Sequence, residues 1–252
     1  MSLIEDRGIL LSIAKYSGRC QRVILFSENN GIVQTFLKLS RNQIPCQVYD
    51  LLDFSCNYLD SYNYRDLEIA VLRSYLKNVF GNRPFIAVLN SAVAIVLSLR
   101  ERGNIRNLYR LFQNLLSLSE FDHVNPLPYY IDFLLNVLAF FGTNLGNGRF
   151  FSGRADESAY YLSPRTGNCV SQEAGEKYKH KLFVIPESFS SYSENVEDIS
   201  RAIDILHYFL RRVLSENPRG QEDRMVEVFR EILLEEVRRQ DFRNVGNPWA
   251  VV

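Results

Sequence analysis

Pro84-Phe-Ile-Ala-Val-Leu-Asn-Ser-Ala-Val-Ala-Ile-Val-Leu-Ser-Leu99 is the stretch that decides the predicted fold. It is apolar, rich in β-branched residues, and flanked by polar residues on both sides. Phe85 to Leu89 therefore reads as a fully buried strand, which Asn90-Ser91 interrupts. Strands buried on both faces belong to parallel sheets, and α/β proteins place their sites where such strands end. The stretch predicts an α/β protein.

The composition is that of a globular protein without an overall charge preference. The 252 residues are 46% apolar and 13% aromatic, and the formal net charge is zero. This excludes a disordered chain, and nucleic-acid binding would need a local basic patch. The N-terminus lacks the order of a signal peptide, and no segment reaches the roughly 18 apolar residues of a membrane helix. We expect an intracellular protein, cytoplasmic or nuclear, without membrane contact.

Cysteine and histidine usage predicts neither a metal site nor a cofactor. The four cysteines form no Cys-x-x-Cys pair, and the three histidines are widely separated: Cys20, Cys46, Cys56, Cys169, His123, His180 and His207. Zinc ligands normally come in close pairs, so we expect reduced thiols. His123 has no recognisable nucleophile to serve, and no catalytic residue is assigned.

Hydrophobic periodicity predicts alternating helices and strands. Strands are expected at residues 22–26, 46–50, 158–162 and 181–185, and helices at residues 3–16, 32–39, 64–80, 104–116 and 129–141. Two amphipathic helices follow residue 194. The whole predicts a central, mostly parallel sheet flanked by helices, a β-hairpin and a C-terminal helical pair, arranged as domains 1–187 and 194–252.

The segment Ser27-Glu-Asn-Asn-Gly31 is expected to be the first strand-to-helix turn, where a phosphate-binding loop would lie. It has one glycine, no following Lys-Ser or Lys-Thr, and an acidic Glu28. We interpret it as a degenerate nucleotide turn.

Two groups of residues are candidate binding sites. Four polar residues should end strands and could line a pocket at one sheet edge: Asp50, Asp53, Asn90 and Ser91. The second group is basic, and its last three members are spaced four apart on one helix face: Arg100, Arg102, Arg106 and Arg110. Such a face could contact phosphates, although a solvated helix surface has the same pattern. Tyr160, Tyr161 and Tyr178 could stack on bases or simply pack in strands.

Three segments carry a resemblance to a known family: Phe85-Ile-Ala-Val-Leu-Asn-Ser91, Leu134-Leu-Asn-Val-Leu-Ala-Phe-Phe141 and Tyr161-Leu-Ser-Pro-Arg-Thr-Gly-Asn-Cys-Val-Ser-Gln-Glu173. They are similar to the RecA-like accessory subunits of the Elongator complex, the fifth subunit above all. The resemblance implies a RecA-like fold without a working phosphate loop. It also implies a ring made with other subunits, which binds tRNA for wobble-uridine modification.

These observations favour a non-catalytic subunit of a multiprotein assembly, with protein subunits as partners and RNA as a further one. One alternative is an enzyme that binds a nucleotide or small molecule at the strand ends. Another is an RNA- or DNA-binding protein that uses the basic helix face.

Overall fold

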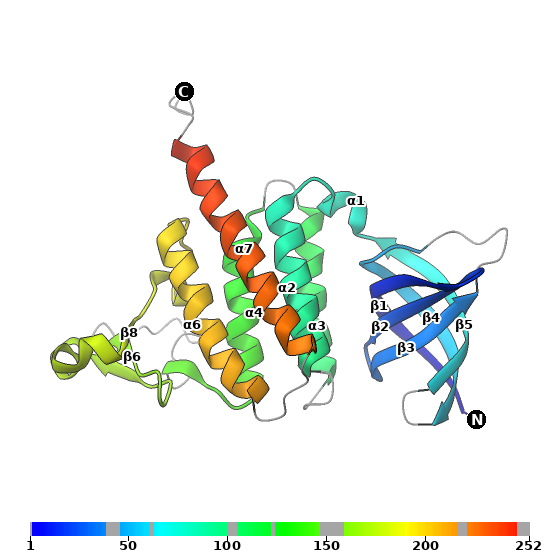
Figure 1. Cartoon of the computed structure of the whole chain (residues 1–252), viewed down its shortest axis with the longest axis horizontal. Coiled ribbons are helices and arrows are strands. Elements are labelled where there is room, and N and C mark those ends of the chain that lie inside the picture. The colour runs from blue at the N-terminus through cyan, green and yellow to red at the C-terminus, as the bar shows by residue number, and fades with distance from the viewer. Residues whose placement is uncertain are drawn as a thin grey trace. The chain divides into compact units, whose positions relative to one another are not determined.

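The computed structural model describes residues 2–38, 46–60, 63–99, 105–121, 124–146, 159–215 and 221–245. The chain packs as two compact units (Figure 1). The first comprises residues 1–89 and 99–124, and the second comprises residues 90–98 and 125–252. The long helix α2 (Arg83–Leu99) contributes residues to both units.

The first unit is built on a five-stranded antiparallel sheet of order β3-β2-β1-β4-β5. Its strands are β1 (Ser2–Ser17), β2 (Cys20–Ser27), β3 (Gly31–Lys38), β4 (Asp50–Asp60) and β5 (Asn63–Ser74). The two edge strands, β3 and β5, also lie against each other. Because all four strand pairings are antiparallel, β3 and β5 run in the same direction. The sheet therefore curls into a five-stranded barrel in the order β1-β2-β3-β5-β4, and a five-stranded, partly open barrel is the architecture of OB-folds.

The barrel encloses an apolar core formed by alternate residues of its strands. The buried cluster consists of Leu10, Val23, Leu25, Val33, Leu37, Cys46, Leu52, Phe54, Cys56 and Leu67. Gly8 on β1 belongs to the same packing, since a Cβ there would lie 3.0 Å from the Phe54 ring.

The first unit also contains helices. They are α1 (Leu76–Val79), α3 (Ile105–Ser117), the 3-10 turn η1 (Leu118–Glu120) and the first turns of α2. Tyr109 and Phe112 of α3 contact the ring of Phe26 on β2, with centroid distances of 5.3 and 6.2 Å. Helix α3 therefore covers one part of the outer barrel wall.

The second unit is helical. Its long helices are α4 (Pro126–Phe140), α6 (Val196–Ser215) and α7 (Gln221–Val245), and α6 packs against both of the others. Helix α4 begins where the Asn125 side chain accepts a hydrogen bond from the Leu127 N–H. A small sheet of order β7-β6-β8 joins them, formed by β6 (Ala159–Leu162), β7 (Cys169–Ser171) and β8 (Phe183–Val184). The connecting turns are α5 (Gln172–Gly175), η3 (Glu176–Lys181) and η4 (Glu187–Phe189).

The predicted α/β fold with a mostly parallel, RecA-like central sheet is wrong, because both sheets of the described residues are antiparallel in every pairing. Residues 3–16 and 32–39 were expected as helices, yet β1 and β3 occupy them, and most of 64–80 is β5. In the middle of β1, residues 8–11 are all buried, so the alternation that marks a strand is lost.

The opposite error concerns Phe85–Leu89, which was predicted as a strand and is part of helix α2. A continuous apolar run fits a buried helix as well as a buried strand, and the 17 residues of α2 exceed a strand's usual length. The strand at 22–26 and the helices at 104–116 and 129–141 are confirmed by β2, α3 and α4. Within the described ranges, no helix has both the length and the apolarity needed to cross a bilayer.

Leu10 provides a test of the barrel core. It is fully buried, so Leu10→Ala removes packed methyl groups and should lower the free energy of unfolding by about 2–5 kcal/mol. Leu72→Ala is the matched control, because Leu72 on β5 is 46% exposed and its truncation should cost less than about 0.5 kcal/mol. Urea unfolding followed by circular dichroism measures both, and equal losses would contradict the barrel.

Candidate nucleic-acid interface

The strand register determines which side chains of β2 and β3 point out of the barrel. Arg22 on β2 lies opposite Ala14 on β1 and Phe36 on β3, and Cys20 lies opposite Lys38. Since Val23 and Leu25 face the core, the even-numbered residues of β2 face outward.

Helix α3 divides this outward row into a covered and an uncovered part. Phe26 lies under Tyr109 and Phe112 and is buried. Farther along the same row, Arg22 and its neighbour Phe36 are exposed. The uncovered part therefore keeps an aromatic ring and a guanidinium side by side in solvent.

A pair of aromatic rings marks the uncovered part. Tyr16 and Phe36 have ring centroids 4.6 Å apart, although they come from β1 and β3. Their side chains are 65% and 41% exposed. Apolar rings are usually buried when the fold allows it, so two touching exposed rings mark a binding surface.

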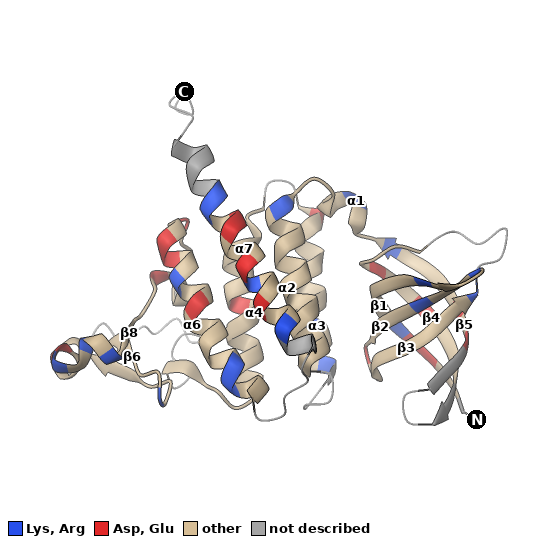
Figure 2. Cartoon of the chain, viewed as in Figure 1, with Lys and Arg blue, Asp and Glu red and all other residues tan. Residues whose placement is uncertain are grey.

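The strands and the turn that carry the aromatic pair also carry cations, and Figure 2 marks the Lys and Arg positions along the chain. Lys15, Arg19, Arg22 and Lys38 are all exposed, and β2 and β3 contain neither Asp nor Glu. Arg22 donates to the Gln34 side chain at 3.1 Å, and among the described residues none of the four cations forms an ion pair. We call this surface the basic ribbon and define it as Tyr16, Arg19, Arg22, Phe36 and Lys38.

Two turns fix the ends of the ribbon. Between β1 and β2, Gly18 adopts a φ of +54° that favours glycine, and no atom lies within 4 Å of the position of a Cβ. Between β2 and β3, the Asp6 carboxylate accepts hydrogen bonds from Ser27 Oγ and from the side chains of Asn29 and Asn30. Burial alone would raise the pKa of Asp6, but these bonds lower it below the usual value.

Ser27–Gly31 is therefore the β-hairpin turn between β2 and β3. The prediction that this segment joins a strand to a helix is wrong. Its asparagines bind Asp6, so its composition serves the hairpin.

The opposite part of the barrel carries the opposite charge. A groove of about 680 Å³ on β1, β4 and β5 is lined by Arg7 and by five carboxylates, those of Glu5, Asp6, Glu28, Asp53 and Glu68. A polyanion would be repelled there and attracted to the ribbon.

The predicted basic helix face is described only in part. Arg100 and Arg102 lie outside the described residues. Arg106 donates a hydrogen bond to Asn29 Oδ1, and Arg110 is exposed on α3.

The four predicted strand-end residues lie in different units. The Asp50 carboxylate accepts the Gln47 N–H at 2.7 Å at the start of β4, and Asp53 pairs with Arg7 at 3.4 Å. Asn90 and Ser91 belong to α2 in the second unit. The expectation assumed a strand at 85–89, and without that strand no shared sheet edge exists. His123 lies outside the described residues.

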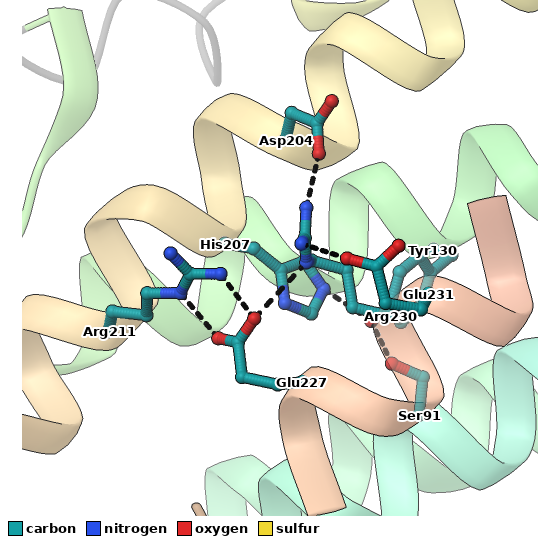
Figure 3. Close-up of polar contacts among 8 residues, drawn as sticks. All are labelled: Ser91, Tyr130, Asp204, His207, Arg211, Glu227, Arg230 and Glu231. Carbon is teal, nitrogen blue, oxygen red and sulfur yellow. Dashed lines mark hydrogen bonds and ion pairs between the residues drawn. The ribbon is translucent and has the colours of Figure 1, made fainter. Parts of the chain in front are cut away.

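Ser91 instead begins a buried chain of hydrogen bonds (Figure 3). Its Oγ lies 2.5 Å from the Tyr130 hydroxyl, which lies 3.0 Å from His207 Nε2. All three side chains are at most 1% exposed, so the chain of hydrogen bonds links α2, α4 and α6 inside the second unit. Burial lowers the pKa of His207 to about 3, with Arg230 and Arg211 adding to the effect and Glu227 opposing it. His207 is therefore neutral in the folded protein.

An ion-pair network joins α6 to α7 beside this chain (Figure 3). Glu227 accepts two hydrogen bonds from Arg211, and Arg230 pairs with Asp204 at 2.5 Å and also with Glu231. Arg230 is only 16% exposed, so its pairing also satisfies a charge that is largely removed from water.

Sequence reasoning missed the basic ribbon. Its signal was present in Lys15-Tyr-Ser-Gly-Arg-Cys-Gln-Arg22, where cations and an aromatic flank a Ser-Gly turn. Phe36 joins them only through the register between β2 and β3. The helix prediction for residues 3–16 concealed the hairpin.

Comparison with known proteins finds relatives along nearly the whole chain. The chain is 24% identical over 239 residues to the DNA repair protein RecO of Rickettsia canadensis, which covers 92% of this chain and 96% of that protein. It is 26% identical over 238 residues to the DNA repair protein RecO of Rickettsia bellii, covering 92% and 97%. The protein of the same name from Anaplasma marginale is 24% identical over 234 residues, covering 88% and 96%. No protein-family profile matches the chain.

These matches overturn the resemblance to Elongator subunits. The chain is similar almost end to end to proteins named DNA repair protein RecO, and its barrel is unlike the parallel RecA-like sheet that the resemblance implied. Reading the protein as a tRNA-processing subunit of an Elongator-like assembly is therefore wrong.

The buried histidine predicts how stability depends on pH. The pKa of His207 is about 3 in the folded chain and 6.5 in the unfolded one, so the unfolded state binds the additional proton below pH 6.5. Its contribution to stability is complete above pH 6.5 and should fall by about 2 kcal/mol between pH 7 and pH 5. His207→Gln should remove this part of the pH dependence, whereas His180→Gln, at an exposed position, should leave it intact. Urea titrations at the two pH values measure the difference, and identical slopes for both variants would contradict the assignment.

Proposed function

We propose that this protein binds single-stranded DNA through the basic ribbon of its barrel and acts in DNA repair. The observation that carries the proposal is the exposed Tyr16–Phe36 pair beside Arg19, Arg22 and Lys38, which form no ion pair among the described residues. The names of the relatives support the DNA part, since each of those proteins is called a DNA repair protein.

The chemistry of the ribbon fits an unpaired strand. Lys and Arg contact phosphates, while exposed rings stack on bases that are free of a partner strand. The face formed by strands 2 and 3 is also the surface on which OB-fold barrels bind oligonucleotides. The proposed activity is binding and requires no catalytic group.

Two further expectations from the sequence, a role of Arg110 and protein partners, are compatible with this proposal. Arg110 would be an additional phosphate contact on α3, which lies beside the ribbon's strand β2. Binding to other protein subunits, the other property expected from the sequence, is part of this proposal. A nuclear location finds no support, because the relatives named above are bacterial.

Charge reversal on the ribbon tests the proposal. Arg22→Glu with Lys38→Glu should weaken binding of a labelled single-stranded oligonucleotide at least tenfold. It should also reduce the slope of log affinity against log salt by about 1.4, since each lost phosphate contact accounts for about 0.7. Phe36→Ala should cost about 1–3 kcal/mol of binding free energy with little change in that slope. Fluorescence anisotropy at several salt concentrations measures both.

Lys77→Glu with Arg83→Glu is the matched control. Both residues are exposed in the first unit away from β2 and β3, and the variant changes the net charge by the same amount. Binding should remain within about twofold of the unchanged chain, because distant charges are screened. Equal losses in both double variants, or none on the ribbon, would contradict the proposal.

A further inference from the structure

A second surface, on the helical unit, combines cations with aromatic rings. A groove of about 570 Å³ lies between η3, the turn after β6, and α6. Its walls include three cations, Arg165, Lys181 and Arg212, and two rings, Tyr178 and Tyr208. No carboxylate belongs to the described lining. We call it the η3 groove.

One wall of the groove is held in place by packing around β6. A Cβ at Gly175 would overlap the Tyr161 ring, so glycine lets the start of η3 approach β6 closely. The Tyr161 hydroxyl then donates to Glu176 at 3.2 Å, and Lys179 pairs with the same carboxylate at 2.8 Å. The negative charge of Glu176 is therefore compensated by Lys179 of the same element, and Lys177, Tyr178 and Lys181 remain exposed.

The other wall is fixed by Arg212 on α6. Its Nη1 donates to the carbonyl oxygens of Pro164 and Arg165 at 2.9 and 3.0 Å, and its guanidinium lies 5.8 Å from the Phe209 ring centroid. This contact ties the turn after β6 to α6. Gly167 closes the turn at a φ of +73°.

The groove presents unpaired positive charge to solvent. Within the described residues, Arg165 and Lys181 of the groove lining have no carboxylate partner. Tyr178 is 58% exposed and Tyr208 is 40% exposed, and the second ring is held edge-on against Phe183 at 5.2 Å. Such rings beside free cations can stack on bases while the cations contact phosphates.

We propose that the η3 groove is a second binding site for single-stranded nucleic acid, separate from the basic ribbon. The inference rests on the proposed function, because it assigns the same class of ligand to the other unit. An acidic peptide would share the attraction to the cations, but it would leave the two exposed rings without flat partners.

Counting the oligonucleotides bound to each protein chain tests the groove directly. Native mass spectrometry of the full chain with a thymidine oligomer of about eight nucleotides, the site size of one module, should show two oligomers bound. Arg165→Glu with Lys181→Glu, both in the groove lining, should leave one bound oligomer, and Arg22→Glu with Lys38→Glu should also leave one. Arg201→Glu with Arg238→Glu is the control, since these exposed arginines of the same unit lie outside the groove lining and the charge change is equal. This control variant should still bind two oligomers.

Every other result decides between the η3 groove, the basic ribbon and a peptide site. Two oligomers on Arg165→Glu/Lys181→Glu would overturn the groove alone, and so would a single oligomer on the unchanged chain that only Arg22→Glu/Lys38→Glu removes. A single oligomer that only Arg165→Glu/Lys181→Glu removes would support the groove and refute the ribbon. If a hexaglutamate peptide binds and loses affinity in the groove variant while the oligomer count stays at two, the groove is a peptide site. No binding at all would overturn both proposals.

Discussion

The closure of the barrel is the constraint on which the candidate interface depends. Once β3 meets β5 and the core residues of β2 turn inward, Arg22 and Phe26 must face outward on the same strand. Helix α3 then covers Phe26 and leaves the other end of the row to solvent. The ribbon thus follows from the packing of apolar residues: the core fixes the register, and the register brings Tyr16 and Phe36 together.

Charge is segregated around this barrel although the chain as a whole is neutral. Cations gather on β2 and β3 and the β1–β2 turn, while five carboxylates gather on β1, β4, β5 and the β2–β3 turn. A polyanion would therefore meet the barrel in one orientation, which favours rapid and directed association. The second unit uses many of its charges internally, as in the network around Arg230, so Arg165 and Lys181 of the η3 groove, which have no carboxylate partner among the described residues, are a distinct feature.

The sequence predicted the amphipathic helices better than the barrel. Helix α3 was recognisable from spacing, because its apolar residues keep a helical period, whereas the apolar run of α2 was taken for a strand. The barrel was missed because residues 8–11 of β1 are buried on both faces, which hides the strand period. The prediction that grouped Asp50, Asp53, Asn90 and Ser91 assumed a strand at 85–89, and that segment is part of helix α2. The ribbon could not be assembled from sequence, since Tyr16 and Phe36 meet only through the strand register.

Photocrosslinking tests the central claim most directly. A single-stranded DNA oligonucleotide that carries iododeoxyuridine would be irradiated with the full chain, and the adducts would be mapped by mass spectrometry. If the ribbon stacks on bases, adducts should form at Tyr16 and Phe36, which are exposed on β1 and β3. Adducts confined to the acidic side of the barrel, or to residues of α3, would contradict the account.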